Sequence, residues 1–154
     1  MCAAPPVLRI GELIELLQED GWTVCLTATQ TAATWIDPEA LARQTGYPVR
    51  VEWRKPGEPE LHPAADVVAV VPATFNVINK WALGINDALA LGLLNETLCA
   101  GVPVYAFPNV KAQLAAHPSY DRHLRLLQEA GVTVTPLAAQ LEWRAVADRI
   151  QAPV

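Results

Sequence analysis

Residues 65–96 of the chain, ADVVAVVPATFNVINKWALGINDALALGLLNE, decide its fold. Asp66–Val71 is a short apolar run rich in valine, which is typical of a strand buried on both faces of a parallel sheet. Pro72 ends this run, a turn follows, and from Ile78 onward apolar residues recur at the three- and four-residue spacings of a helix. The stretch therefore predicts a strand, a tight turn and a helix. This order places the turn, residues 74–76, at the carboxyl edge of a sheet, where ligands commonly bind.

The composition favours a single domain over residues 1–154, since a chain of this length supplies one sizeable core. Hydrophobic residues make up 52% of the chain and charged residues 18%, a balance that favours an oligomer. The formal charge of −5 and the lack of a lysine and arginine cluster disfavour nucleic acid and membrane surfaces as partners. No apolar run has the length of a bilayer span and the first residues do not resemble a signal peptide, so we expect a cytoplasmic protein.

The three cysteines, Cys2, Cys25 and Cys99, have no metal-ligand spacing, and the sequence predicts no metal site. Cys25 falls in an apolar strand pattern and Cys99 at the end of a helical one, so both are interpreted as small hydrophobic residues. Cys2 is the one cysteine that could approach a ligand. None of the three is predicted to be a nucleophile.

Helical and strand patterns alternate along the rest of the chain. The central helix is expected to continue without interruption to Ala100-Gly101. The order of elements predicts an α/β protein, a three-layer α/β/α sandwich around a mainly parallel sheet. Because a first strand normally feeds the first helix of such a fold, residues 1–4 look like the tail of a strand that is cut short. The other predicted helices cover 7–18, 38–44, 117–130 and 137–150, and the other strands cover 22–28, 49–53, 102–107 and 132–134.

Several polar residues outside the central turn have a structural interpretation. Thr29 is expected to cap a helix or to bind a phosphate, and the sequence does not separate the two. Asp37 is expected to cap the next helix, with Pro38 at its first position. His62, in a Pro-rich loop over residues 54–64, is interpreted as an exposed loop residue, with a role near a ligand as the alternative. His123 is expected to be solvated.

The central stretch resembles the flavoprotein family of homo-oligomeric, flavin-containing cysteine decarboxylases, which includes phosphopantothenoylcysteine decarboxylase. The family's signature is a strand of the form AD-apolar-apolar-PA, then an A-N-T turn and a helix reading I-x-K-x-A-x-G-I-x-D-x-L. The resemblance covers nearly the whole chain, from the first helix to Val134, through VPVYAFPNVKAQLAAHP and LLQEAGVTV. The residues that match the signature in place and spacing are Asp66, Pro72, Ala73, Asn76, Ile78, Lys80, Ala82, Gly84, Ile85, Asp87 and Leu89.

The resemblance implies a Rossmann-like sheet of flavodoxin-like strand order, with FMN at its carboxyl edge and subunits assembled as trimers or multiples of trimers. An isoalloxazine ring needs a flat apolar slot with polar groups at its edge. Trp35 and Phe75 would supply that slot and Asn76 the edge, whereas ordinary core packing is the alternative for the two rings. The expected cofactor-binding residues are Thr29, Trp35, Pro72, Ala73, Thr74, Phe75, Asn76, Val77 and Asn109.

Three catalytic elements of the resembled decarboxylases are altered in this chain. In those decarboxylases a histidine lies eight residues before the aspartate of the Ala-Asp pair. Glu58 occupies this position here, and His62 lies four residues nearer to that aspartate. Their P-A-M-N motif, whose asparagine binds the substrate carboxylate, reads Pro108–Lys111, so that Lys111 replaces the asparagine. Pairing with an anionic substrate and plain solvation are the two interpretations of Lys111. Their Gly-rich flap with a reactive cysteine has no counterpart after Gly131. The remaining candidates for catalytic residues are His62 and Lys111.

The first turn also departs from the family pattern. Cys2–Ala4 stands where the family has a Gly-Ser phosphate turn, so the usual phosphate-binding serine is missing. Backbone N–H groups at the start of the first helix are an alternative, but Pro5 and Pro6 remove two of them.

Two classes of function follow from this interpretation. The first is an FMN-dependent enzyme, a diverged decarboxylase or oxidoreductase acting on a small acidic substrate, with Asn76 and Lys111 as polar contacts. The second is a non-catalytic flavin-binding or regulatory module that keeps the fold and the homo-oligomer. Prenyl-flavin synthesis is a third option, for which Lys111 and Arg122 are the only basic support.

Overall fold

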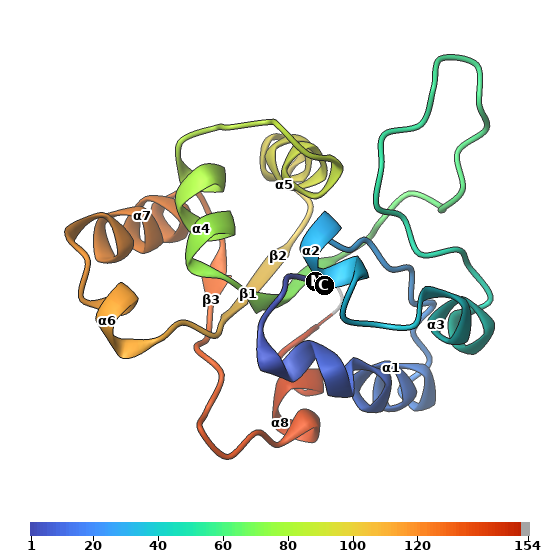
Figure 1. Ribbon diagram of the computed structural model, residues 1–154, viewed down its shortest axis with the longest axis horizontal. Coiled ribbons are helices and arrows are strands. Elements are labelled where there is room, and N and C mark those ends of the chain that lie inside the picture. Colours follow the sequence, from blue (N-terminus) through green and yellow to red (C-terminus); the bar gives the residue numbers. More distant parts are fainter. Residues whose placement is uncertain (152–154) are drawn as a thin grey trace.

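The computed structural model of the chain describes residues 1–151 and contains a parallel sheet of three strands in the order β1-β2-β3. β1 is Val68–Ala73, β2 is Val104–Pro108 and β3 is Thr133–Val134. Val68 lies opposite Val104, and Tyr105 lies opposite Thr133. Helices cover both faces of this sheet, with α1 and α8 on one side and α4, α5 and α7 on the other (Figure 1). The expected three-layer α/β/α arrangement is therefore confirmed.

Successive residues of a strand point to opposite faces of the sheet, and apolar side chains lie on both faces. In β1, Val70 belongs to the core under α4 and α7, whereas Val71 belongs to the core under α1. In β2, Ala106 and Phe107 divide in the same way. This period of two, with both faces apolar, is typical of a central parallel strand.

Pro72 does not end the strand, which corrects the sequence interpretation. β1 continues through Pro72 to Ala73, because the ladder with β2 shifts register after Val70 and resumes at Ala73, opposite Pro108. The amide of Asn109 then donates to the Ala73 carbonyl at 2.9 Å. Pro72 has no N–H to give to a ladder, and the register shift accommodates this.

The amino-terminal part contains short helices and extended chain in place of the two predicted strands. η1 (Pro5–Arg9) and α1 (Ile10–Glu19) lead to α2 (Gln30–Ala33) and α3 (Pro38–Thr45). The predicted strands 22–28 and 49–53 meet only in one parallel bridge, Thr27 with Arg50. They do not become regular strands because the inner edge of 22–27 has no neighbouring strand along most of its length.

Met1 and Cys2 lie between segment 22–28 and β1, as expected for the tail of a strand. The Met1 nitrogen donates to the Thr27 carbonyl at 2.7 Å, and the Met1 carbonyl accepts from the Thr29 amide at 3.1 Å. On the other side, the Cys2 amide donates to the Pro72 carbonyl at 3.1 Å.

The predicted long central helix is two helices, α4 (Phe75–Ala82) and α5 (Leu89–Ala100). The connector 83–88 turns at Gly84, whose φ of 68° lies in the region that glycine adopts without strain. An ion pair of 2.6 Å between Lys80 and Asp87 holds the connector against the end of α4. α4 also begins three residues before the predicted start at Ile78.

The carboxyl-terminal part has α6 (Ala112–Ala115), which the sequence did not predict, and α7 (Pro118–Glu129). The closing helix α8 covers only Trp143–Ala147, not 137–150. The Thr135 and Leu137 amides instead donate to carbonyls of β2, each at 2.9 Å, so the chain stays extended there. None of the helices described in residues 1–151 combines the length and apolar character needed to cross a bilayer.

Candidate functional site

The carboxyl ends of β1 and β2 meet at one edge of the sheet. The hydrogen bond from the Asn109 amide to the Ala73 carbonyl joins the two strand ends directly. Thr74 and Asn109, the first residues beyond these ends, therefore lie on adjacent strands at the same edge. This confirms the placement of the polar turns that the sequence predicted, although not the role of the residues in them.

The start of α4 supplies free backbone donors at this edge. Thr74 is the N-cap, and its hydroxyl accepts from the Val77 amide at 3.4 Å. Phe75 and Asn76 are the first two helical residues, whose N–H groups have no carbonyl acceptor within the helix. The helix dipole makes this end attractive to electron-rich groups. Asn76 is exposed, so its amide side chain is also available to a ligand. These donors fit the polar edge of a flavin ring.

Phe75 contacts two aromatic rings, those of Tyr120 in α7 and of His117, the N-cap of α7. Its ring centroid lies 5.7 Å from that of His117, edge to face, and 6.0 Å from that of Tyr120, stacked. Trp35 lies beyond the end of α2 and its residue surface is 44% exposed. Among residues 1–151, Phe75 has aromatic contacts with the two α7 rings and none with Trp35. The predicted ring slot between Trp35 and Phe75 thus stays a prediction.

Thr29 caps α2, which confirms its structural interpretation. Its hydroxyl accepts from the Ala32 amide at 3.2 Å. Because accepting this bond leaves the hydroxyl proton available, Thr29 can still donate to a ligand oxygen. The cap of α3 is confirmed as well, with Asp37 Oδ1 accepting from the Ala40 amide at 2.9 Å and Pro38 at the first position.

The first turn offers little to a phosphate. The Ala4 amide donates to the Cys2 carbonyl at 3.0 Å, and the Val7 amide donates to the Ala4 carbonyl at 2.9 Å. Pro5 and Pro6 open η1 and have no N–H group. The turn uses its own donors, so a phosphate at this edge depends on groups elsewhere, such as the Thr29 hydroxyl.

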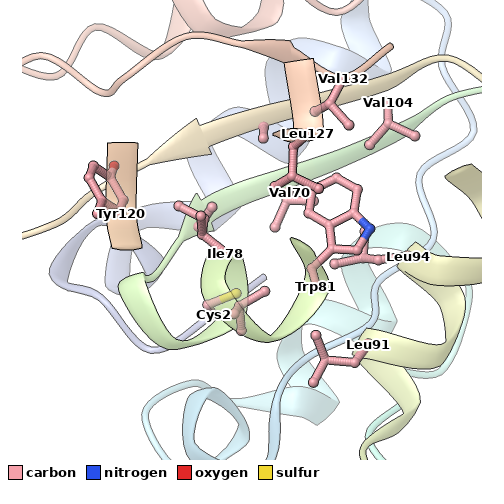
Figure 2. Close-up of a cluster of buried hydrophobic side chains, with 13 residues drawn as sticks. Cys2, Val70, Ile78, Trp81, Leu91, Leu94, Val104, Tyr120, Leu127 and Val132 are labelled. Atoms are coloured by element: carbon pink, nitrogen blue, oxygen red, sulfur yellow. The ribbon is translucent and has the colours of Figure 1, made fainter. Parts of the chain in front are cut away.

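The cysteines do not follow the sequence interpretation in full. Cys2 is 2% exposed and belongs to the core cluster with Ile78 and Trp81, so its side chain is buried (Figure 2). Cys25 is partly buried, and burial raises the pKa of its thiol. Cys99 is exposed, so it does not pack as the small hydrophobic residue that the sequence predicted. It lies in the last turn of α5.

The two catalytic candidates lie at opposite ends of the sheet. His62 precedes the amino end of β1, is partly buried, and its Nε2 atom lies 2.7 Å from the Pro48 carbonyl oxygen. Lys111 is exposed and follows the carboxyl end of β2. Glu58, at the position of the family histidine, accepts from the Lys55 amide at 2.8 Å within its own loop. Because the strands are parallel, the fold does not bring His62 and Lys111 together.

The sequence did not predict the contact between His123 and Asn79 beside the candidate site. His123 was expected to be solvated, but it is 8% exposed and its Nδ1 atom lies 2.6 Å from Asn79 Oδ1. The Asn79 side-chain nitrogen donates to the Phe75 carbonyl at 2.7 Å. The signal was present, since His123 is three residues from Tyr120 and four from Leu127, both of which face the core.

The parallel sheet with helices on both faces defines a Rossmann-like α/β domain. A comparison with protein families matches the Flavoprotein family over residues 2–154, and the chain belongs to that family. The chain is 30% identical over 131 residues to the Coenzyme A biosynthesis bifunctional protein CoaBC of Bacillus subtilis (strain 168), covering 81% of the chain and 32% of that protein. It is 27% identical over 138 residues to phosphopantothenoylcysteine decarboxylase of Arabidopsis thaliana, covering 84% of the chain and 65% of the relative. The chain thus spans about a third of the length of CoaBC.

Solved structures show the same fold. The FMN-dependent cysteine decarboxylase SpaF superposes with a TM-score of 0.81 at 20% identity, over 96% of this chain and 90% of that one. The FMN-binding protein AtHal3 superposes with a TM-score of 0.77 at 20% identity, over the same shares of the two chains. These matches confirm the Rossmann-like class predicted from the sequence.

Proposed function

We propose that this chain binds FMN at the carboxyl edge of the sheet. The observation that carries the proposal is the meeting of two strand ends with the free N–H groups of Phe75 and Asn76. Membership of the Flavoprotein family supports it. So do the structural neighbours whose titles describe FMN dependence or FMN binding.

Each candidate residue has a defined task in this proposal. The α4 amides and the Asn76 side chain hold the polar edge of the isoalloxazine ring, and Asn109 lies beside them on the next strand end. The Thr29 hydroxyl donates to the phosphate. Trp35, together with Pro72, Ala73 and Val77, supplies apolar contact. When bound, FMN supplies a two-electron acceptor.

The reaction we propose is a flavin-dependent decarboxylation or oxidation of a small acidic substrate. Lys111 supports the substrate class, because an exposed ammonium beside Asn109 can pair with a carboxylate at the same edge. The name of the Arabidopsis thaliana relative describes a decarboxylase, which supports the reaction class.

We further propose that the chain forms a homo-oligomer, a trimer or a multiple of trimers. Support comes from the connector between α4 and α5, where Leu83 is 62% and Ile85 is 37% exposed.

A cytoplasmic location is part of the same proposal. The three cysteines are free within residues 1–151, which fits the reducing cytoplasm.

A non-catalytic flavin-binding module is the second candidate function. The observation that favours it is that His62 contacts the Pro48 carbonyl and Glu58 contacts the Lys55 amide, so both side chains have partners away from the carboxyl edge. In this case the chain binds FMN without turning over a substrate.

Flavin binding tests the proposal directly. The purified protein should show the visible absorption of a flavin, or quench the fluorescence of added FMN with saturation at one equivalent per chain. Riboflavin, which lacks the phosphate, should bind more weakly. A colourless protein that does not bind added FMN would refute the cofactor assignment. Anaerobic bleaching of the bound flavin by a thiol-bearing carboxylic acid distinguishes the enzyme from the binding module.

A further inference from the structure

A pocket of about 390 Å³ lies between α5 and the segment that leads to β1. Figure 1 shows this segment, in green, as a loop beside α5. Residues 50–60 supply most of the lining, and α5 supplies the rest. The volume lies at the lower end of the range for small-molecule sites, roughly 300–1,000 Å³. We call this space, bounded by residues 50–60 and 89–96, the α5 pocket.

One side of the α5 pocket is apolar. Leu89 and Leu93 are one turn apart on α5, and both line the pocket. Trp53 lines it as well, and its ring packs over Gly92, which leaves no room for a Cβ there. Trp53 is nevertheless 48% exposed, so part of the indole remains uncovered. This side can therefore take a hydrocarbon chain or an aromatic ring.

Cationic side chains outnumber carboxylates in the rest of the lining. The cations are Arg50, Arg54 and Lys55, and the carboxylates are Glu60 and Glu96. Glu60 is shared, since it lies 2.6 Å from Arg50 Nη1 and 3.4 Å from Arg54 Nε. The ion pairs within residues 1–151 do not include Lys55. The pocket therefore favours an anion over a cation.

Arg50 contributes hydrogen-bond donors that have no acceptor. Its backbone is fixed by hydrogen bonds with Leu26 and Ala28, and its side chain is only 11% exposed. Nη1 donates to Glu60, whereas Nε and Nη2 have no hydrogen-bond partner within residues 1–151. Arg50 lines both the α5 pocket and the larger cavity beside β1. Charged donors without an acceptor are costly, and the planar guanidinium suits a carboxylate, so a carboxylate in the pocket would be stabilised.

We propose that the α5 pocket binds a small carboxylic acid with an apolar or aromatic body. The carboxylate lies among the three cations, and the body lies on Trp53 and the two leucines. An uncharged ligand would leave the cations unmatched, and an inorganic anion would leave the apolar side uncovered. The lining shares no residue with the predicted FMN contacts, so the proposal stands whether or not FMN binds.

Binding of 4-phenylbutyrate tests the proposal. The probe should shift the indole N–H signal of Trp53 in a proton–nitrogen NMR spectrum, and the shift should saturate. Trp53→Phe identifies this signal among those of the five tryptophans. Excess FMN in the sample keeps the probe out of the proposed flavin site. 4-Phenylbutan-1-ol has the same body without the charge and should bind at least about tenfold more weakly. Equal affinity of the two probes, or no saturable shift, would refute the proposal.

Two variants of opposite charge change check the place of the carboxylate. Lys55→Gln removes a cation and should weaken binding of 4-phenylbutyrate several-fold. Glu96→Gln removes a carboxylate from α5, leaves the loop unaltered and should tighten binding several-fold. Glu129→Gln, at an exposed position near the end of α7, is the control and should leave the Kd unchanged. A disturbed loop would only weaken binding, so tighter binding by Glu96→Gln is a signature of charge. Equal affinities of the Lys55 and Glu96 variants would overturn the proposal.

Discussion

The Nδ1 atom of His123 lies 2.6 Å from Asn79 Oδ1, and this contact joins α7 to α4 at the start of the candidate site. Asn79 continues the connection, because its side-chain nitrogen donates to the Phe75 carbonyl at 2.7 Å. His123→Leu would leave the partly buried Asn79 oxygen without this partner. We expect the free energy of unfolding to fall by about 1–3 kcal/mol, measured by urea denaturation.

A double-mutant cycle checks the cause of this loss. Asn79→Leu and His123→Leu together should cost less than the sum of the single changes, with a coupling of about 0.5–3 kcal/mol. Arg122→Leu, at an exposed neighbour on α7, is the control and should change stability by less than about 0.5 kcal/mol. Additive single effects would show that the pair does not couple the two helices.

Asn76→Asp should weaken FMN binding without unfolding the domain. The change replaces the amide donor with a negative charge at an exposed position in the first turn of α4. Loss of one good hydrogen bond corresponds to about a tenfold rise in Kd, which fluorescence titration would measure. Asn86→Asp makes the same chemical change at an exposed position in the connector and should leave Kd unchanged. Unchanged binding by Asn76→Asp would mean that the pocket lies elsewhere.

Gly92→Ala should release the loop before β1 from α5. A Cβ at Gly92 would lie 2.0 Å from Cη2 of the Trp53 ring, which packs over this glycine. Alanine gains about 1 kcal/mol of helix propensity, so overall stability should change little while Trp53 moves away. Trypsin cleavage after Arg54 should become several-fold faster. Trp53→Ala alone should speed this cleavage to the same extent. The double variant Trp53→Ala/Gly92→Ala should be cleaved no faster than Trp53→Ala.

Tyr120 should make the protein less stable in alkali. Burial raises the pKa of the Tyr120 hydroxyl, so above pH ~10 the unfolded chain loses this proton while the folded chain keeps it. The folded state then binds more protons, and stability falls as the pH rises through this range. In Tyr120→Phe, the decline between pH 9 and 11 should be shallower, measured by urea denaturation. An identical decline would mean that other groups cause it.

Local sequence signals predicted most of the fold. Valine-rich β1, the N-cap of α3 at Asp37 and the glycine at the end of α5 each act through their own backbone, so the sequence alone identifies them. The predicted strand at residues 22–28 is wrong for a different reason. A strand needs neighbouring strands to pair with, and segment 22–27 faces a cavity beside β1 and has one bridge, from Thr27 to Arg50.

The sequence pattern also did not predict the break between α4 and α5. Apolar residues recur with helical spacing through the connector, and only the turn at Gly84 and the pairing of Lys80 with Asp87 separate the two helices. Gly84 is tolerated in helices, so it did not by itself predict a break.

The candidate site was predicted in its position but not in its details. The order of strand, turn and helix places Thr74 to Val77 at the carboxyl edge whatever the distant contacts are. The packing of Phe75 against His117 and Tyr120 depends on how α7 docks, which no local pattern determines.

The placement of His62 and Lys111 beyond opposite ends of parallel strands has a kinetic consequence. One polypeptide cannot present both side chains to the same small molecule. Any turnover that required both would need His62 from one subunit and Lys111 from another, so its rate would depend on the assembly of the homo-oligomer.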